Sequence, residues 1–330
     1  MSDNPAVNVD VRLPSDWAEG EMREDIRRAF TNRPLVLPPK WLYDDRGSEL
    51  FDQITRLDQY YPTEAERSLL IERADEIAAV TKADTVIELG SGTSDKTRTL
   101  LDSFHQAGHL RRFAPLDVSE ATLIDAATML AERYEGLEVH ALVGDFTRHL
   151  GHLPDGNCRL VAFLGGTLGN FYVEERHAFL GAVADNLEIG EWLLLGVDLV
   201  KPIDRILAAY NDDEGLTEHF IKNVLAVLNR SLAADFDLDA FDYAPMWDGR
   251  EERVDMRLRT TMPQVVRIEE LGLEVNLGEG EELRVEISTK FRPDRLTPEL
   301  QDAGFELRHF WTAANDDFGL ALAQRVGDGR

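Results

Sequence analysis

The residues best suited to chemistry lie in the segment ELGSG, residues 88–92, which closes a short apolar run at residues 85–89. An apolar run that ends in glycine predicts a buried strand and a tight turn, where the backbone can approach a ligand closely. Asp95 replaces the third glycine of the G-x-G-x-x-G dinucleotide motif, which weakens the case for a pyrophosphate site. The segment suits S-adenosylmethionine (SAM) better, because SAM has no phosphate to place at a helix N-terminus. We expect Thr93 or Ser94 to start the next helix.

Two acidic residues follow the next two apolar runs. Asp117 ends one run, and Asp145 ends the other, with Phe146 beside it. Ligands of α/β sheets bind outside the carboxyl ends of the strands, so both acids are expected at the ligand-binding edge. There Asp117 can accept hydrogen bonds from both ribose hydroxyls and Asp145 from an adenine amino group, while Phe146 contacts the ring. Taken alone, each acid is equally consistent with a loop residue or a helix N-cap.

A fourth apolar run, residues 160–164, leads into GGTLGN, residues 165–170. The glycines permit a close backbone approach, and Asn170 offers a donor and an acceptor to a substrate. A simple turn would have the same composition.

The order of elements predicts an α/β domain. Apolar runs alternate with helical stretches from Thr63 to about Lys201, which is typical of a parallel sheet covered on both faces. Thr63 and Glu66 have the spacing of a capping box that opens the first of these helices. Residues 305–312 and 318–324 are expected to form a hairpin that returns to this sheet, and the first twenty residues are expected to be loosely held.

After Lys201 the pattern changes to two helices, residues 202–211 and 217–232, followed by strands with period-2 alternation. In residues 283–290, the alternation places Glu286 and Ser288 on one face with Arg284 and Lys290, opposite Leu283, Val285 and Ile287. The pattern alone predicts that the polar face is exposed to solvent. A second, smaller α+β domain is therefore expected.

Composition excludes several classes of function. The 62 acidic residues exceed the 35 lysines and arginines, and the net charge of −27 disfavours binding to nucleic acid or to an anionic membrane. A single cysteine, Cys158, and an N-terminus without signal-peptide features favour a cytoplasmic protein. We expect no metal site: Asp235, Asp237 and Asp239 begin like an EF-hand loop but lack its glycine and final glutamate, and the paired histidines lack a zinc-protease glutamate.

Nine segments together resemble the L-histidine Nα-methyltransferases of ergothioneine biosynthesis, in order, from about Leu37 to Leu322. The combination is far more specific than any one of its motifs. The segments are residues 37–43 (LPPKWLY), 47–54 (GSELFDQI), 60–64 (YYPTE), 88–94 (ELGSGTS), 144–146 (GDF), 163–170 (FLGGTLGN), 223–229 (NVLAVLN), 235–241 (DFDLDAF) and 288–293 (STKFRP).

The resemblance implies a Rossmann-like class I methyltransferase domain, residues 64–200 and 291–330, that binds SAM. It also implies a smaller α+β substrate-binding domain, residues 15–63 and 201–290. The residues implied to bind SAM are Gly90, Lys96, Asp117, Asp145 and Phe146. Those implied to bind L-histidine are Tyr60 and Asn170 on the amino group, Asn170 and Tyr210 on the carboxylate, Glu286 and Ser288 on the imidazole, and Tyr43, Phe51 and Met256 around the pocket.

The expected reaction is threefold methylation of the α-amino nitrogen of histidine, with Tyr60 and Asn170 as the catalytic pair, in a monomer that needs no metal. The same chemistry on tryptophan or tyrosine is the nearest alternative, and Glu286 argues against it. A nicotinamide dehydrogenase would share the strand-turn-helix but is missing the third glycine. A non-catalytic amino-acid sensor on the same scaffold is the third alternative.

Overall fold

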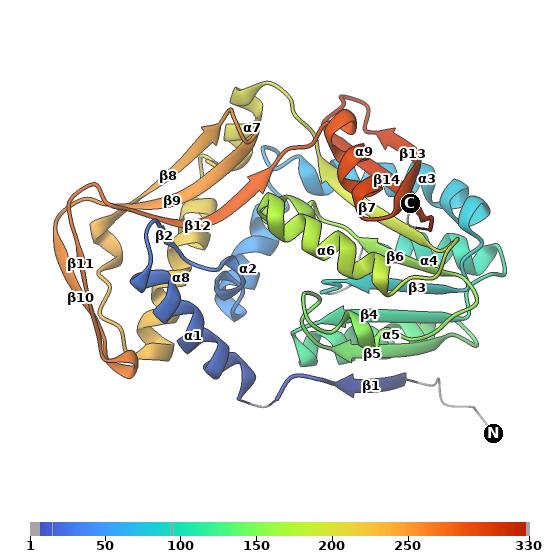
Figure 1. Ribbon diagram of the computed structural model, residues 1–330, viewed down its shortest axis with the longest axis horizontal. Coiled ribbons are helices and arrows are strands. Elements are labelled where there is room, and N and C mark those ends of the chain that lie inside the picture. Colours follow the sequence, from blue (N-terminus) through green and yellow to red (C-terminus); the bar gives the residue numbers. More distant parts are fainter. Residues whose placement is uncertain (1–6, 15, 93, 95, 328–330) are drawn as a thin grey trace. The chain divides into compact units, whose positions relative to one another are not determined.

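The computed structural model describes residues 7–14, 16–92, 94 and 96–327. The chain forms two compact units. Unit 1 comprises Met1–Pro14, Pro62–Leu199 and Phe291–Arg330, and unit 2 comprises Ser15–Tyr61 and Val200–Lys290. The chain therefore leaves unit 1 twice to build unit 2 (Figure 1).

Unit 1 is built on a mixed sheet whose strands, among the described residues, lie in the order β1-β5-β4-β3-β6-β7-β14-β13 (Figure 1). The strands run parallel to their neighbours except β14, which is antiparallel to both β7 and β13. The strands are β1 (Val7–Val11), β3 (Thr85–Leu89), β4 (Arg112–Asp117), β5 (Glu138–Val143), β6 (Arg159–Phe163), β7 (Trp192–Asp198), β13 (Phe305–Thr312) and β14 (Phe318–Arg325).

Two layers of helices cover this sheet, which is why its central strands are apolar on successive residues. Every residue of β3, β6 and β7 is buried. One apolar core contains side chains of α3 (Pro62–Thr81), α4 (Thr97–Gln106) and α5 (Glu120–Arg133). The core of the other face contains side chains of α6 (Val173–Asp185), α9 (Pro293–Asp302) and the 3-10 helices η2 (Leu150–His152) and η3 (Thr167–Asn170). The predicted α/β architecture is thus confirmed, as is the hairpin β13–β14 against β7.

The expectation that the first twenty residues are loosely held is wrong for Val7–Val11. These residues form β1, which pairs in parallel with β5 from Val7 opposite Val139 to Val11 opposite Val143. Val7 and Val9 pack against the core beneath the sheet. Their alternation with polar residues was the signal for an edge strand. Residues 1–6 lie outside the described residues.

Unit 2 combines a four-stranded sheet, order β2-β12-β9-β8 in the described part of the chain, with a separate hairpin β10–β11. One apolar core joins the sheet, the hairpin and the helices. The strands are β2 (Leu35–Val36), β8 (Phe241–Asp248), β9 (Arg253–Thr260), β10 (Gln264–Ile268), β11 (Leu273–Leu277) and β12 (Glu282–Thr289). The helices are α1 (Trp17–Thr31), η1 (Pro39–Leu42), α2 (Asp45–Ile54), α7 (Ile203–Ala209), α8 (Leu216–Leu232), η4 (Leu238–Ala240) and η5 (Glu269–Leu271).

Candidate functional site

The glycine-containing turn of unit 1 follows β3 at the carboxyl edge of the sheet. Gly90 and Gly92 have φ of +68° and +48°, a conformation that favours glycine. The Gly90 N–H donates to the Leu116 carbonyl at 2.8 Å, which joins the turn to the end of β4. A Cβ at Gly90 would lie 3.5 Å from the ring of Phe146. Glycine therefore leaves the turn backbone open on this side.

The helix after the turn starts later than predicted. Ser94 has a φ of +54°, which is not helical, and α4 begins at Thr97. The prediction that Ser94 starts the helix is therefore wrong. Thr93 and Asp95 lie outside the described residues.

The two predicted acids occupy the ends of neighbouring strands. Asp117 ends β4, and its carboxylate oxygens accept from the backbone N–H groups of Gly92 and Ser119, both at 2.9 Å. Asp145 follows β5 and accepts from the N–H and the hydroxyl of Thr147 at 2.8 and 2.6 Å. A carboxylate has about four acceptor positions, so both acids can accept further hydrogen bonds from a ligand. The turn and the two acids thus lie along one edge of unit 1.

Phe146 lies in an aromatic cluster beside Asp145. Its ring centroid is 5.3 Å from that of Phe163, 6.1 Å from Phe179 and 6.3 Å from Phe171, each edge-on. Such packing fixes the orientation of a partly buried ring. The arrangement suits contact with a flat apolar group.

Glu88 and Ser91 provide buried polar atoms that a ligand could satisfy. Thr97 donates its hydroxyl hydrogen to Oε1 of Glu88. Glu88 Oε2 and Ser91 Oγ are buried with no hydrogen-bond partner within the described parts of the chain. Burial raises the pKa of Glu88 to about 7, against the opposing effect of the Thr97 hydrogen bond. A cationic ligand group beside Glu88 would favour its ionised form, so these residues fit an α-ammonium group such as that of SAM.

Lys96 forms an ion pair with Glu66, for which the sequence predicted a capping-box role. Glu66 is fully buried; its Oε2 accepts from the Lys96 ammonium, and its Oε1 accepts from the Gly165 N–H at 2.7 Å. The predicted capping-box role of Glu66 at the start of α3 is therefore wrong. The partners lie 30 and 99 residues away in sequence, so no local pattern could reveal them. Lys96 is thereby oriented at the edge of unit 1, where it can bind an anionic ligand group.

Gly196 gives Glu66 the space that it occupies. A Cβ at Gly196 would lie 1.9 Å from Glu66 Oε1, a distance that no relaxed structure tolerates. We expect Gly196→Ala to lower the free energy of unfolding by about 3 kcal/mol or more and to weaken SAM binding, because Glu66 must leave Lys96. Gly181→Ala on α6 is the matched control: no atom lies within 4 Å of its Cβ, and helix propensity predicts a neutral or stabilising effect. Urea unfolding of both variants measures this, and equal stabilities would contradict the assignment.

In unit 2 the structure brings four predicted aromatic residues together. Ring centroids are separated by 5.6 Å for Tyr43–Phe51, 6.2 Å for Phe51–Tyr60 and 6.1 Å for Tyr60–Tyr210, all edge-on. Phe220 of α8 lies 5.2 Å from Tyr43 and 5.7 Å from Phe51. Sequence analysis missed Phe220, because an apolar residue on an amphipathic helix gives no signal beyond core packing.

A bulge in β12 determines where Glu286 points. The register with β9 shifts between Arg284 and Glu286, so that Arg284 pairs with Arg257 whereas Glu286 pairs with Met256. Neighbouring positions on β9 face opposite sides, so Arg284 and Glu286 also lie on opposite faces. The predicted shared face of Arg284 with Glu286 and Ser288 is therefore wrong.

The prediction that the polar face of β12 is exposed to solvent is also wrong for Glu286 and Ser288. Glu286 and Ser288 do share a face, but their exposed fractions are only 8% and 7%. Met256, opposite Glu286, is 2% exposed. Burial at this position makes ionisation of the Glu286 carboxyl group costly.

The raised pKa of Glu286 predicts a pH-dependent stability. Burial raises this pKa from 4.5 to about 8, although Lys290 lowers it in part. Between these two values the folded state keeps a proton that the unfolded state loses, so the free energy of unfolding falls as the pH rises, by at most about 1.4 kcal/mol per pH unit. We expect Glu286→Gln to be more stable than the wild type by an amount that grows by about 2 kcal/mol from pH 5.5 to 7.5. Urea unfolding at both values tests this, and a difference independent of pH would contradict it.

Tyr210, Ser288 and Lys290 form a closed triangle of buried polar atoms. The Lys290 ammonium lies 2.7 Å from both Tyr210 Oη and Ser288 Oγ, and the two hydroxyl oxygens are 2.8 Å apart. Lys290 is 2% exposed, and its ammonium also lies 4.4 Å from the Tyr210 ring centroid. Sequence analysis placed Lys290 on the same face as Ser288 but gave it no role.

Asn170 belongs to unit 1, where it ends η3 after β6. Gly166, at the N-terminus of η3, has a φ of +69°, which explains a glycine at this position. Asn170 is half-buried. The residue therefore lies partly exposed near the carboxyl end of β6.

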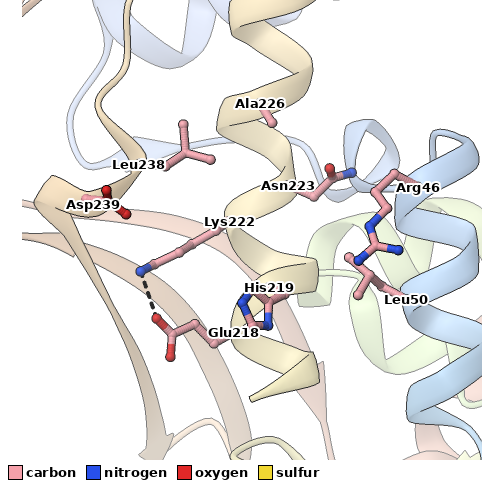
Figure 2. Close-up of a pocket in the computed structure, with 9 residues that line it drawn as sticks. All are labelled: Arg46, Leu50, Glu218, His219, Lys222, Asn223, Ala226, Leu238 and Asp239. Atoms are coloured by element: carbon pink, nitrogen blue, oxygen red, sulfur yellow. Dashed lines mark ion pairs between the residues drawn. The ribbon is translucent and has the colours of Figure 1, made fainter. Parts of the chain in front are cut away.

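A separate pocket of about 250 Å³ lies between α2 and α8 in unit 2 (Figure 2). Arg46, His219 and Lys222 line it, and Lys222 is paired with Glu218 at 2.7 Å. None of the predicted site residues lines this pocket.

In the described portion of the chain no group of three His, Cys, Asp or Glu side chains is placed to hold a metal ion, and no helix there is long and apolar enough to cross a membrane.

Unit 1 is a class I SAM-dependent methyltransferase domain, as its sheet order, the glycine turn after β3 and the acids at the ends of β4 and β5 indicate. The chain also forms a smaller α+β unit, unit 2. More specifically, the chain belongs to the family of histidine-specific, SAM-dependent methyltransferases, whose sequence model matches residues 22–325.

Three relatives document the similarity. The chain is 50% identical to the histidine N-alpha-methyltransferase of Mycolicibacterium smegmatis, over 95% of this chain and 98% of that protein. It is 47% identical to the histidine N-alpha-methyltransferase of Mycobacterium tuberculosis, over 97% of this chain and 99% of that protein. It is 35% identical to ergothioneine biosynthesis protein 1 of Schizosaccharomyces pombe, over 64% of this chain and 29% of that protein.

Proposed function

We propose that this protein transfers three methyl groups from SAM to the α-amino nitrogen of L-histidine, giving trimethylhistidine (hercynine) for ergothioneine biosynthesis. Family membership and the two bacterial relatives named for this activity support the reaction. The single structural observation that supports the substrate best is Glu286, a buried carboxylate turned inward by the bulge beside Ser288. An imidazole ring can donate an N–H to this carboxylate.

Each ligand group has proposed partners in this chain. In unit 1, Asp117 binds the ribose hydroxyls of SAM, Asp145 and Phe146 bind the adenine, and Lys96 with the backbone at Gly90 binds the amino-acid part. Histidine is bound through its ring by Glu286 and Ser288, through its carboxylate by Tyr210 and Asn170, and through its amine by Tyr60 and Asn170. Tyr43, Phe51 and Met256 enclose the ring. The edge-on packing of Tyr43, Phe51, Tyr60 and Tyr210 supports a preformed aromatic wall.

Catalysis in this proposal rests on positioning. SAM supplies an electrophilic methyl group on its sulfonium, and the acceptor must present a neutral nitrogen lone pair in line with the S–CH₃ bond. Alignment of reacting groups can contribute up to about 7–11 kcal/mol. Tyr60 and Asn170 orient the nitrogen, and the amine loses its proton to solvent or through the Tyr60 hydroxyl. Two adjustable side chains suit a nitrogen that gains methyl groups and loses hydrogens over three cycles.

The proposal includes the setting of the reaction. The protein acts as a cytoplasmic monomer, and L-histidine is its small-molecule partner. Neither nucleic acid nor membrane takes part, since the net charge of −27 repels both kinds of anionic surface. The chemistry calls for no metal ion, because the sulfonium is itself sufficiently electrophilic.

One experiment separates this function from its alternatives. The purified protein is incubated with SAM and the twenty amino acids, and the products are analysed by mass spectrometry. We expect histidine alone to gain one, two and three methyl groups in sequence. Methylation of tryptophan or tyrosine instead would support the alternative substrates, and no mass shift combined with tight amino-acid binding would support a sensor.

A further inference from the structure

The proposed mechanism gives no role to Lys290, a buried charged residue that contacts two of the proposed substrate-binding side chains. It follows Ser288 by two positions and lies on the same side of the chain, 2.7 Å from both Ser288 Oγ and Tyr210 Oη. The backbone N–H of Lys290 donates to the Glu252 carbonyl at 2.8 Å, which fixes the end of β12. The backbone of Lys290 is therefore fixed, and its ammonium contacts two hydroxyl groups.

The number of protons in this triangle restricts what it can offer to a ligand. An ammonium has only protons to donate, so both hydroxyl oxygens accept from Lys290. Two oxygens 2.8 Å apart repel each other unless one hydroxyl proton lies between them. The pair has two hydroxyl protons in total, so at most one remains to be donated outside the triangle. If Tyr210 donates that proton outward, Ser288 donates to Tyr210 and can only accept from a further group.

We propose that Lys290 is a positioning residue that sets the hydrogen-bond polarity of the ring-binding site, making Ser288 an acceptor toward the substrate ring whenever Tyr210 donates to the substrate carboxylate. This inference rests on the proposed function. The ring that fits must present an N–H to Ser288. A five-membered ring with an acceptor nitrogen but no N–H leaves Ser288 without its hydrogen bond, and such a mismatch lowers the affinity about tenfold or more.

The consequence is a selectivity that Glu286 alone does not explain. Glu286 can accept an N–H or, when protonated, donate to a bare nitrogen, so it does not by itself distinguish these rings. Lys290, by contrast, stays a donor in both cases and keeps Ser288 in one role. Removing Lys290 lets the two hydroxyls separate, and Ser288 can then donate to a bare ring nitrogen.

The test compares histidine with β-(4-thiazolyl)alanine, whose ring has an acceptor nitrogen and no N–H. Steady-state KM and kcat are measured for both in the wild type and in Lys290→Met, which has nearly the same length but no charge. We expect the variant to lower the KM for the analogue about tenfold, because Ser288 can then donate to its bare nitrogen, with kcat and the KM for histidine changed less than threefold. The preference for histidine should therefore fall about tenfold. Lys222→Met, whose side chain is paired with Glu218 on α8, is the matched control and should leave the preference unchanged.

A preference within threefold of the wild type in folded Lys290→Met overturns the inference, and so does an equal loss for both substrates. If Lys290→Met does not fold, Tyr210→Phe is tested instead, because Ser288 can donate to the ring once Tyr210 Oη is removed. The preference for histidine over the analogue should then fall by more than threefold, although Tyr210 itself is assigned to the substrate carboxylate. An unchanged preference in Tyr210→Phe overturns the inference. Failure of the wild type to methylate histidine would instead overturn the proposed function, so the two failures are distinguishable.

Discussion

Glu286→Ala is expected to lower kcat/KM for histidine by about 10²-fold and to reduce the preference for histidine over tryptophan by at least as much. Glu286 is buried opposite Met256, with only 8% of its surface exposed. A site built to bond an N–H rejects a ring that leaves its carboxylate unpaired, at a cost of about 1–3 kcal/mol or more. The indole of tryptophan has a single ring nitrogen, so it can pair with Glu286 or with Ser288 but not with both, whereas imidazole can pair with both. Removing the carboxylate therefore removes much of the advantage of imidazole.

The measurement is turnover of histidine and of tryptophan by the wild type and Glu286→Ala under the same conditions. Glu274→Ala, at an exposed position on β11, is the matched control and should behave as the wild type. The raised pKa of Glu286 means that its burial lowers the free energy of unfolding near neutral pH. Loss of this carboxyl group in Glu286→Ala should therefore not destabilise the protein electrostatically. An unchanged preference in a folded variant would remove Glu286 from the role of selecting the ring.

Asn170→Ala is expected to lower kcat by about 10²- to 10³-fold and to leave mono- and dimethylated products unconverted. Its side chain is offered at the end of η3, directly after the turn at Gly166, and it is proposed to bind both the amine and the carboxylate. Losing it frees the nitrogen to rotate out of line, and alignment is the largest contribution available to this reaction. Later cycles should suffer more, because a methylated nitrogen has fewer hydrogens for Tyr60 to bind.

Product distributions over time, read by mass, measure this effect. Asn276→Ala, at an exposed position on β11, serves as the control. Tyr60→Phe is the companion variant: the ring can keep its contacts with Phe51 and Tyr210, so only the hydroxyl is lost, and a smaller fall of about tenfold is expected. A full rate and complete trimethylation in Asn170→Ala would exclude a positioning role for this residue.

Hydrophobic pattern was sufficient for the α/β part of the fold. β3, β6 and β7 are buried along their whole length, and runs of apolar residues report that state directly. The hairpin β13–β14 was predicted as well, although only β14, whose first six residues are buried, contains such a run. β1 was missed, because a five-residue edge strand with two exposed residues and no fully buried one differs little from an irregular terminus.

The site residues differ in how far local pattern could reveal them. The glycine turn at Gly90 and the acids Asp117 and Asp145 follow from strand order alone, and their roles stay predictions. Glu66 and the bulge before Glu286 could not be found in this way. Glu66 depends on partners far away in sequence, and a bulge inverts the faces of a strand without changing its composition.

The most direct measurement is a crystal structure of the protein with S-adenosylhomocysteine and L-histidine bound together. The account predicts one imidazole nitrogen at about 3 Å from a Glu286 oxygen and the other at about 3 Å from Ser288 Oγ, with the adenine beside Asp145 and Phe146. Histidine bound with its ring away from Glu286, or an adenosyl group bound away from the turn at Gly90, would contradict it.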